Sequence, residues 1–330
     1  MKLLYLLLIS SLAAATSLDA QTARLKFQKL KPLPYGRYDM AYATDGELIY
    51  LIGGSGHRQN LNSDIFTYLV KYGTWLKLRT GLPFENRKKG AAVFLPTQNR
   101  IYLIGGVGEY QPDYAPSRNQ AYLLKDIEYI DTRTKRLEKW GPNQHRAASV
   151  GVSTWNGKLY MFGGAKVAND ERFGFNYLAD FNELDPLSGE WKSLPSMPHA
   201  KETQGCIIDG ILYTFGGFNG ATFREIHGYD LAKGEWRKIG DLPNPLRSHV
   251  VTSWKNFVFL IGDVTKQDYL AIYDTSTGET REFKTNMNGH SRGACVINDK
   301  LYVFGGLLFS TNNATKDTLF VLDLKELFNK

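Results

Sequence analysis

The chain contains few of the residues that common catalytic and metal-binding motifs require. Its 330 residues include 2 cysteines and 6 histidines. No H-E-x-x-H, G-x-S-x-G or paired-cysteine metal motif is present. The glycine pairs follow apolar runs and do not open helices, which excludes a phosphate-binding loop of the usual kind. We therefore predict no catalytic residue, no metal ligand and no cofactor.

Acidic residues are slightly outnumbered, and the basic residues form no run. The chain has 40 lysines and arginines against 33 aspartates and glutamates, a formal net charge of +7. Such an excess favours anionic partners. Because a nucleic-acid tail is a dense cluster of basic residues, we predict no nucleic-acid partner.

One apolar run, residues 3–12, follows Lys2 and precedes small residues at positions 13–17. This order is typical of a secretory signal peptide, which we place at residues 1–20 with cleavage between positions 15 and 20. A retained N-terminal anchor is the alternative. No later segment is apolar enough to span a membrane. We expect residues 21–330 to form a single, exported, monomeric domain that is periplasmic or extracellular.

Glycine and aromatic residues recur in a long repeat. Six short apolar and aromatic runs end in Gly-Gly, or once in Gly-Asp, at intervals of 43 to 58 residues. The pairs begin at Gly53, Gly105, Gly163, Gly216, Gly262 and Gly305. Each run is typical of a buried β-strand that ends in a turn. A repeat of this length is typical of propellers and solenoids.

A second pattern follows the glycine pairs. Five segments, 68–75, 130–140, 184–191, 229–236 and 273–283, end in Trp or Phe, and four contain a glycine turn before that residue. They predict strand–turn–strand hairpins. With an apolar segment before each glycine pair, the repeat has four strands. The predicted fold is all-β: a six-bladed propeller of four-stranded antiparallel blades. Gly141 and Pro142 follow Trp140 and predict a weak outer strand in the second blade.

Residues 24–328 resemble the kelch family of β-propellers, because the glycine pairs, spaced Tyr and Trp residues and repeat length match that family. The phase of the repeat predicts that residues 24–30 form the outer strand of the last blade and close the ring, which removes two exposed sheet edges. Cys206 and Cys295 lie at the same point of the fourth and sixth repeats. Another blade would separate them, so we expect two buried thiols and no disulfide.

Basic residues recur in the loops that lead into the innermost strands. They are Arg37, Arg87, Arg146, Lys201 and Arg247, with His290 and Arg292 in the sixth repeat. The topology brings these loops to one mouth of the central tunnel. There, a ring of cations is suited to carboxylate or phosphate. The alternative is internal: the same side chains satisfy loop carbonyls or nearby carboxylates. The resemblance implies acidic peptide binding at arginines of this type, best matched by Arg87, Arg146 and Arg247.

The second and third repeats have the longest loops after their glycine pairs, at 107–126 and 165–180. Long loops on a rigid scaffold concentrate binding residues. The candidate ligand-binding residues in them are Tyr110, Tyr114, Arg172, Phe173 and Tyr177. Their aromatic faces suit a sugar or a peptide. Alternatively, these aromatic residues cover the blade edges.

These observations predict a binding module for an acidic peptide or acidic carbohydrate, with a protein or small-molecule partner. Two alternatives stay open. One is an enzyme that resembles N-acetylneuraminate epimerase. For such an enzyme Arg146 would bind the carboxylate of the sugar, and Glu171 and Asp263 would transfer protons. The other is a structural scaffold with an exposed apolar patch. The scattered histidines disfavour the copper radical oxidases that share this repeat.

Overall fold

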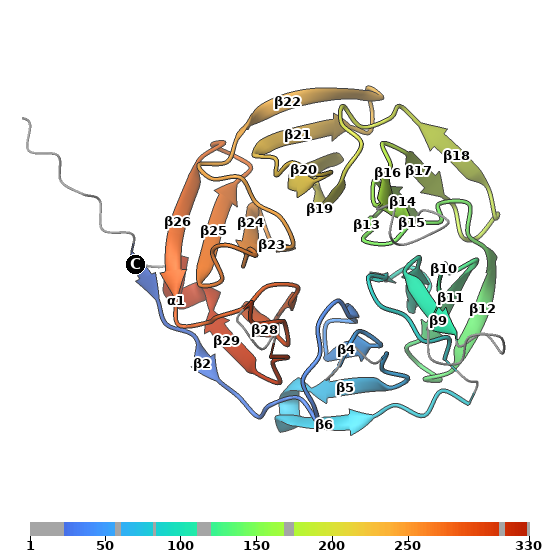
Figure 1. The fold of residues 1–330 in the computed structure, drawn as a ribbon, viewed down its shortest axis with the longest axis horizontal. Coiled ribbons are helices and arrows are strands. Elements are labelled where there is room, and N and C mark those ends of the chain that lie inside the picture. The colour runs from blue at the N-terminus through green and yellow to red at the C-terminus, as the bar shows by residue number, and fades with distance from the viewer. Residues whose placement is uncertain are drawn as a thin grey trace, which may run out of the picture.

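A computed structural model describes residues 23–56, 61–81, 84–110, 120–167, 175–309 and 314–328. It confirms the predicted all-β, six-bladed propeller (Figure 1). The six innermost strands follow one another around the central axis, and the last of them lies beside the first. Neighbouring strands within each blade are antiparallel, except for one two-residue strand added at the outer edge of the fifth blade.

The first three blades are continuous in sequence. Blade 1 contains β3 (Ala41–Thr44), β4 (Leu48–Ile52), β5 (Ile65–Leu69) and β6 (Thr74–Lys77). Blade 2 contains β7 (Ala91–Leu95), β8 (Arg100–Ile104), β11 (Asp126–Asp131) and β12 (Leu137–Pro142). Blade 3 contains β13 (Gly151–Trp155), β14 (Lys158–Phe162), β17 (Phe181–Leu184) and β18 (Trp191–Leu194). The 3-10 helix η2 (Val70–Tyr72) lies in the turn between β5 and β6.

The N-terminal segment contributes to the last two blades. Blade 4 contains β19 (Glu202–Ile208), β20 (Ile211–Phe218), β21 (Glu225–Asp230) and β22 (Glu235–Asp241). Blade 5 contains β23 (Val250–Trp254), β24 (Phe257–Ile261), β25 (Tyr269–Asp274), β26 (Thr280–Thr285) and β1 (Arg24–Leu25). Blade 6 contains β27 (Gly293–Ile297), β28 (Lys300–Phe304), β29 (Leu319–Asp323) and β2 (Gln28–Lys29), followed by helix α1 (Leu324–Phe328).

The N-terminal segment closes the ring as predicted, but fewer residues of the predicted range 24–30 pair with the last blade. Gln28 and Lys29 pair with Val321 and Phe320 and complete blade 6. The prediction was wrong for the start of the segment, because Arg24 and Leu25 run parallel to β26 and add a fifth strand to blade 5. The chain therefore joins the outer edges of two blades. The prediction for blade 2 was also wrong: β12 includes Trp140, Gly141 and Pro142 and accommodates them through a β-bulge.

The core lies between the faces of neighbouring blades. Strands β4, β8, β14 and β28 each contain four consecutive buried residues, because a blade covers each of their two faces. Both cysteines are free: Cys295 is buried as predicted, whereas Cys206 is only partly buried. In the described part of the chain, no helix has the length and apolar character needed to cross a membrane.

The closing segment is held by Phe27, which is 2% exposed between blades 5 and 6. Its backbone N–H donates to Asn286 Oδ1 at 2.8 Å, and Asn286 Nδ2 donates to its carbonyl at 2.9 Å. Phe27→Ala should lower the free energy of unfolding by about 3–5 kcal/mol, because it leaves a cavity at the closure. Urea unfolding measures this change. Leu187→Ala, at a side chain 80% exposed, is the control. A loss below about 1 kcal/mol for Phe27→Ala would contradict the closure.

Candidate functional site

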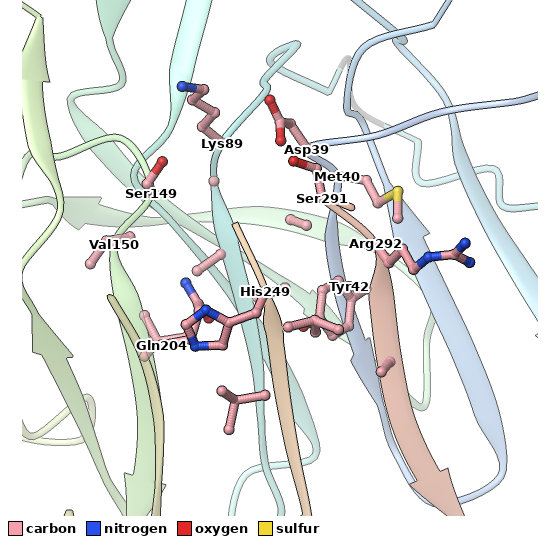
Figure 2. A pocket seen from close by; sticks show the side chains of 18 of the residues that line it. Asp39, Met40, Tyr42, Lys89, Ser149, Val150, Gln204, His249, Ser291 and Arg292 are labelled. Carbon is pink, nitrogen blue, oxygen red and sulfur yellow. The ribbon is translucent and has the colours of Figure 1, made fainter. Parts of the chain in front are cut away.

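A cavity of about 520 Å³ occupies the centre of the ring and is lined by residues from all six blades. Its walls are the innermost strands β3, β7, β13, β19, β23 and β27. Asp39, Lys89, Ser149 and Ser291 lie at one level of it, with His249 and Gln204 below them in the view of Figure 2. A cavity of this size is suited to a small molecule or to one part of a larger ligand.

Five residues in the loops before the innermost strands form a ring at this mouth, which we call the throat ring. All five have a left-handed backbone, with φ between 51° and 54°: Asp39, Lys89, Ser149, Ser248 and Ser291. Hydrogen bonds connect them from blade to blade: Ser149 to Lys89 (2.7 Å), Lys89 to Asp39 (2.8 Å), Asp39 to Ser291 (3.3 Å) and Ser291 to Ser248 (3.1 Å). Blade 4 interrupts the throat ring, because β19 already includes Thr203.

The glycine pairs allow the close approach between blades. Gly53 and Gly54 have φ values of 59° and 87°, and a Cβ on Gly53 would lie 2.6 Å from the Arg87 carbonyl oxygen. The second glycine of each pair donates its backbone N–H to a carbonyl in the loop of the next blade. Gly54 donates to Arg87 at 2.8 Å, and Gly306 donates to Arg37 at 2.8 Å across the closure. Only glycine fits these positions without strain.

Three of the predicted cations connect neighbouring blades, and we call them blade clamps: Arg37, Arg87 and Lys201. The backbone carbonyl of each accepts from the glycine pair of the preceding blade. The side chain of each donates to the first glycine carbonyl of its own blade, at 3.0 Å, 3.4 Å and 2.6 Å respectively. All three are at most 1% exposed, so the internal alternative describes them.

The third strand of each blade supplies the environment of the blade clamp. Arg87 forms a buried ion pair with Glu128. Phe66 occupies the position of Glu128 in blade 1, where the Arg37 guanidinium carbon lies 5.3 Å from the Phe66 ring centroid and 4.5 Å from that of Tyr35. Burial lowers the pKa of both arginines. A charge buried in this way requires such partners.

Blade 4 differs from blades 1 and 2 because a histidine, His227, lies at the position that faces its blade clamp. His227 occupies the position of Glu128 in this blade. Burial lowers the pKa of Lys201 to about 8. Burial, together with the charge of Lys201, lowers the pKa of His227 to about 4. His227 is therefore neutral at pH 7 and adds no second charge beside the ammonium group.

The structure separates the other predicted cations from the blade clamps. In blade 3, His145 Nε2 donates to the Gly163 carbonyl at 2.8 Å, whereas Arg146, one residue later, is exposed. Arg292 is 5% exposed and donates to the backbone carbonyls of Gly289 and Asn288. Burial lowers the pKa of Arg292 to about 10. Five of the seven basic residues predicted for the ring, including His290, thus lie inside the molecule, and Arg146 and Arg247 are accessible.

Arg247 lies in a small aromatic cluster at the rim. Its guanidinium carbon is 4.8 Å from the centroid of the Phe218 ring, and the Tyr177 ring packs edge-on against Phe218 at 6.0 Å. Tyr177 is partly buried, and burial raises the pKa of its hydroxyl. The charge of Glu202 adds to this shift, and the charge of Arg247 opposes it. Among the described residues, none pairs with the Arg247 guanidinium group in a salt bridge. This cluster joins blades 3, 4 and 5 at the mouth.

The long loops of blades 2 and 3 form two adjacent hairpins. They consist of β9 (Val107–Tyr110) with β10 (Gln120–Leu123), and β15 (Ala165–Val167) with β16 (Phe175–Tyr177). Phe175 is 44% exposed, and Lys89 Nζ lies 5.0 Å from its ring centroid. Tyr110 belongs to β9. Tyr114, Glu171, Arg172 and Phe173 lie outside the described residues, so their predicted roles remain predictions.

Asp263, which replaces the second glycine of blade 5, stabilises a loop. Its carboxylate accepts the N–H groups of Arg247 (2.8 Å), Thr265 (2.7 Å) and Lys266 (3.2 Å) and the Thr265 hydroxyl (2.5 Å). These bonds outweigh burial and lower its pKa. It is 2% exposed. A buried, ionised carboxylate with this many donors is a poor proton acceptor. Within the described ranges, no three His, Cys, Asp or Glu side chains gather to hold a metal.

The throat ring, His249 and Gln204 were not found from the sequence. A serine or lysine gives no local signal for a left-handed backbone, and no motif contains His249 or Gln204. The nearest signal was the basic position two residues before Asp39 and Lys89, which identified the loops but not the residues that face the cavity.

Removal of the blade-clamp partner tests the internal role of Arg87. Glu128→Ala should lower the free energy of unfolding by about 3–5 kcal/mol, because it leaves the Arg87 charge buried without a carboxylate. Urea unfolding with tryptophan fluorescence measures this loss. Lys238→Ala removes the cation of an exposed pair with Asp241 and should leave the midpoint unchanged. Equal midpoints for Glu128→Ala and wild type would show that Arg87 needs no partner there.

Comparison with known proteins gives one family. Residues 40–263 match the family model described as the KLHDC2/KLHL20/DRC7 Kelch-repeats domain. The chain is 22% identical over 231 residues to kelch-like protein 25 of Xenopus tropicalis, covering 70% of this chain but 37% of that protein. It is 24% identical over 257 residues to kelch domain-containing protein 10 of Homo sapiens, covering 69% and 55%. It thus spans well under two thirds of both proteins.

A bacterial enzyme is also similar. N-acetylneuraminate epimerase 1 of Escherichia coli O6:H1 is 23% identical over 309 residues, which cover 78% of this chain and 80% of the enzyme. The six glycine-ended strands, the closed ring and the family match agree. The chain belongs to the kelch-repeat β-propeller family.

Proposed function

We propose that this chain is an exported binding module whose tunnel mouth takes an anionic or polar ligand, an acidic peptide or an acidic carbohydrate. The kelch propeller is a protein-interaction fold, and the finer specificity is our proposal. Export rests on the signal-peptide pattern of residues 1–20, which lie outside the described residues. Periplasmic or extracellular location follows from that pattern alone.

The observation that carries the proposal is the arrangement around Arg247. Its guanidinium group lies on the Phe218 ring, and Arg247 is partly exposed next to Ser248, which lines the cavity. A guanidinium group supported by an aromatic ring and without a salt bridge can bind a carboxylate through two parallel hydrogen bonds. Exposed Arg146 adds a second cation on the same face. Tyr177 and Phe175 supply aromatic surface beside these cations.

Arg247→Ala should weaken binding of glucuronic acid or of a glutamate-rich peptide by about 10- to 100-fold, because a hydrogen bond to a charged group contributes about 1.5–3 kcal/mol. Isothermal titration calorimetry at low and at high salt measures the change. Affinity for the wild type should fall as salt rises.

Arg237→Ala is the matched control, because it removes one exposed guanidinium group from the outer strand β22. It should leave the affinity unchanged. If Arg247→Ala binds both probes as tightly as the wild type, or if no binding occurs at millimolar ligand and low salt, the proposal fails.

Epimerase activity is the second candidate, favoured by the similarity to N-acetylneuraminate epimerase 1 over 80% of that enzyme. Asp263 is bound by four donors and does not suit proton transfer. Glu171 remains a candidate outside the described residues. NMR exchange spectroscopy of the two anomers of N-acetylneuraminate tests the activity. A binding module leaves the exchange rate as it is in buffer, whereas faster exchange would establish the enzyme.

A further inference from the structure

The cavity contains a buried imidazole without a hydrogen-bond partner. His249 immediately precedes β23, lines the cavity and is 5% exposed. Within the described part of the chain, neither Nδ1 nor Nε2 makes a hydrogen bond. The Phe215 carbonyl lies near the ring, but the two groups do not meet hydrogen-bond geometry, and this carbonyl accepts the Thr203 hydroxyl at 2.9 Å. Because buried polar groups are almost always paired, two ring nitrogens without a protein partner beside a cavity mark a place where a polar group of a ligand can bind.

Gln204 supplies a second polar group on the same side of the cavity. It lies on β19, the innermost strand next to β23, and its side chain lines the cavity with that of His249 (Figure 2). Blades 4 and 5 thus present a carboxamide and an imidazole. The walls from blades 1, 2 and 3 are more apolar and include Tyr42, Ala92 and Val152. The cavity therefore has one polar side and one largely apolar side.

The polar side is uncharged at the level of His249. Burial lowers the pKa of His249 to about 4; the charge of Asp263 opposes this shift, and that of Lys201 adds to it. A neutral imidazole offers one donor and one acceptor, and the carboxamide of Gln204 offers an NH2 donor group and a carbonyl acceptor. A hydroxyl group both donates and accepts, and it satisfies such a pair. A carboxylate only accepts, and it would leave the acceptor nitrogen unpaired.

From this geometry we infer that the cavity binds the neutral, hydroxyl-bearing ring of a carbohydrate, a pyranose, with its hydroxyls on His249 and Gln204 and a C–H face on the apolar walls. The inference rests on the proposed function of the mouth and selects carbohydrate over acidic peptide. A carboxylate on such a sugar would remain at the rim, where Arg247 is accessible. The two sites would then recognise two parts of one ligand.

The test uses the full chain and five probes: methyl α-D-glucopyranoside, methyl β-D-galactopyranoside, N-acetylglucosamine, glucuronic acid and a glutamate-rich peptide. Saturation-transfer NMR and calorimetry measure binding to wild type, His249→Leu, Gln204→Leu and Arg247→Ala. At least one neutral sugar should bind at millimolar concentration. His249→Leu and Gln204→Leu should each weaken it by about tenfold, the effect of one lost hydrogen bond. Arg237→Ala, on the outer strand β22, is the control and should change neutral-sugar affinity less than twofold.

His249→Asn keeps a donor and an acceptor and should retain more affinity than His249→Leu, whereas a packing role alone would not favour it. If His249→Leu does not fold, the sugar affinity of Gln204→Leu tests whether this side of the cavity binds the ring hydroxyls. The inference is overturned if no neutral sugar binds, if binding is unchanged in both leucine variants, or if only the peptide binds. A different result would contradict the proposed function alone. In that case neutral sugars bind through His249, the anionic probes bind no more tightly than the neutral sugars, and Arg247→Ala does not change the affinity for the anionic probes.

Discussion

Each blade is joined to the next through the loop that precedes its innermost strand. The Arg37 carbonyl accepts from Gly306 of blade 6 while its side chain donates to the Gly53 carbonyl of blade 1. Arg87 and Lys201 make the same pair of contacts one and three blades later. Because one residue serves two blades, the spacing of the blades and the position of the loops are set together. The throat ring lies two residues further along these loops, so the shape of the mouth depends on this constraint.

The features on which the proposed ligand site rests occur where the repeat departs from its own pattern. Blade 4 has His227 where blade 2 has Glu128, and Thr203 lies in a strand where other blades have a left-handed loop residue. Blade 5 has Asp263 in place of a glycine, and the Asp263 carboxylate fixes the backbone of Arg247. His249 and Gln204 belong to the same two blades. In blade 4 Lys201 still fastens the ring, whereas in blade 5 Arg247 is accessible at the rim.

The architecture was predictable because it depends on a repeated local signal. Glycine pairs, strand periodicity and the phase of the repeat gave six blades and their closure. Pairing of residues 24–25 with blade 5 was missed, since a two-residue parallel contact has no sequence pattern. The blade-3 side chain that reaches the glycine carbonyl was misplaced by one residue, because it is His145 and not Arg146. Burial of the blade clamps and the unpaired state of His249 depend on distant segments, so the sequence alone could not separate fastening residues from accessible ones.

The closed ring, held at its mouth by the glycine pairs, is the central claim. Native-state hydrogen exchange, resolved at single amides, tests it at the closure itself. The Gly306 amide, bonded to the Arg37 carbonyl at 2.8 Å, should exchange with the same free energy as Gly54 and as the buried strand amides, because the ring opens only when the fold does. Exchange at Gly306 that is much faster than at Gly54, with β28 still protected, would show that the ring opens locally between blades 6 and 1 and would contradict the account.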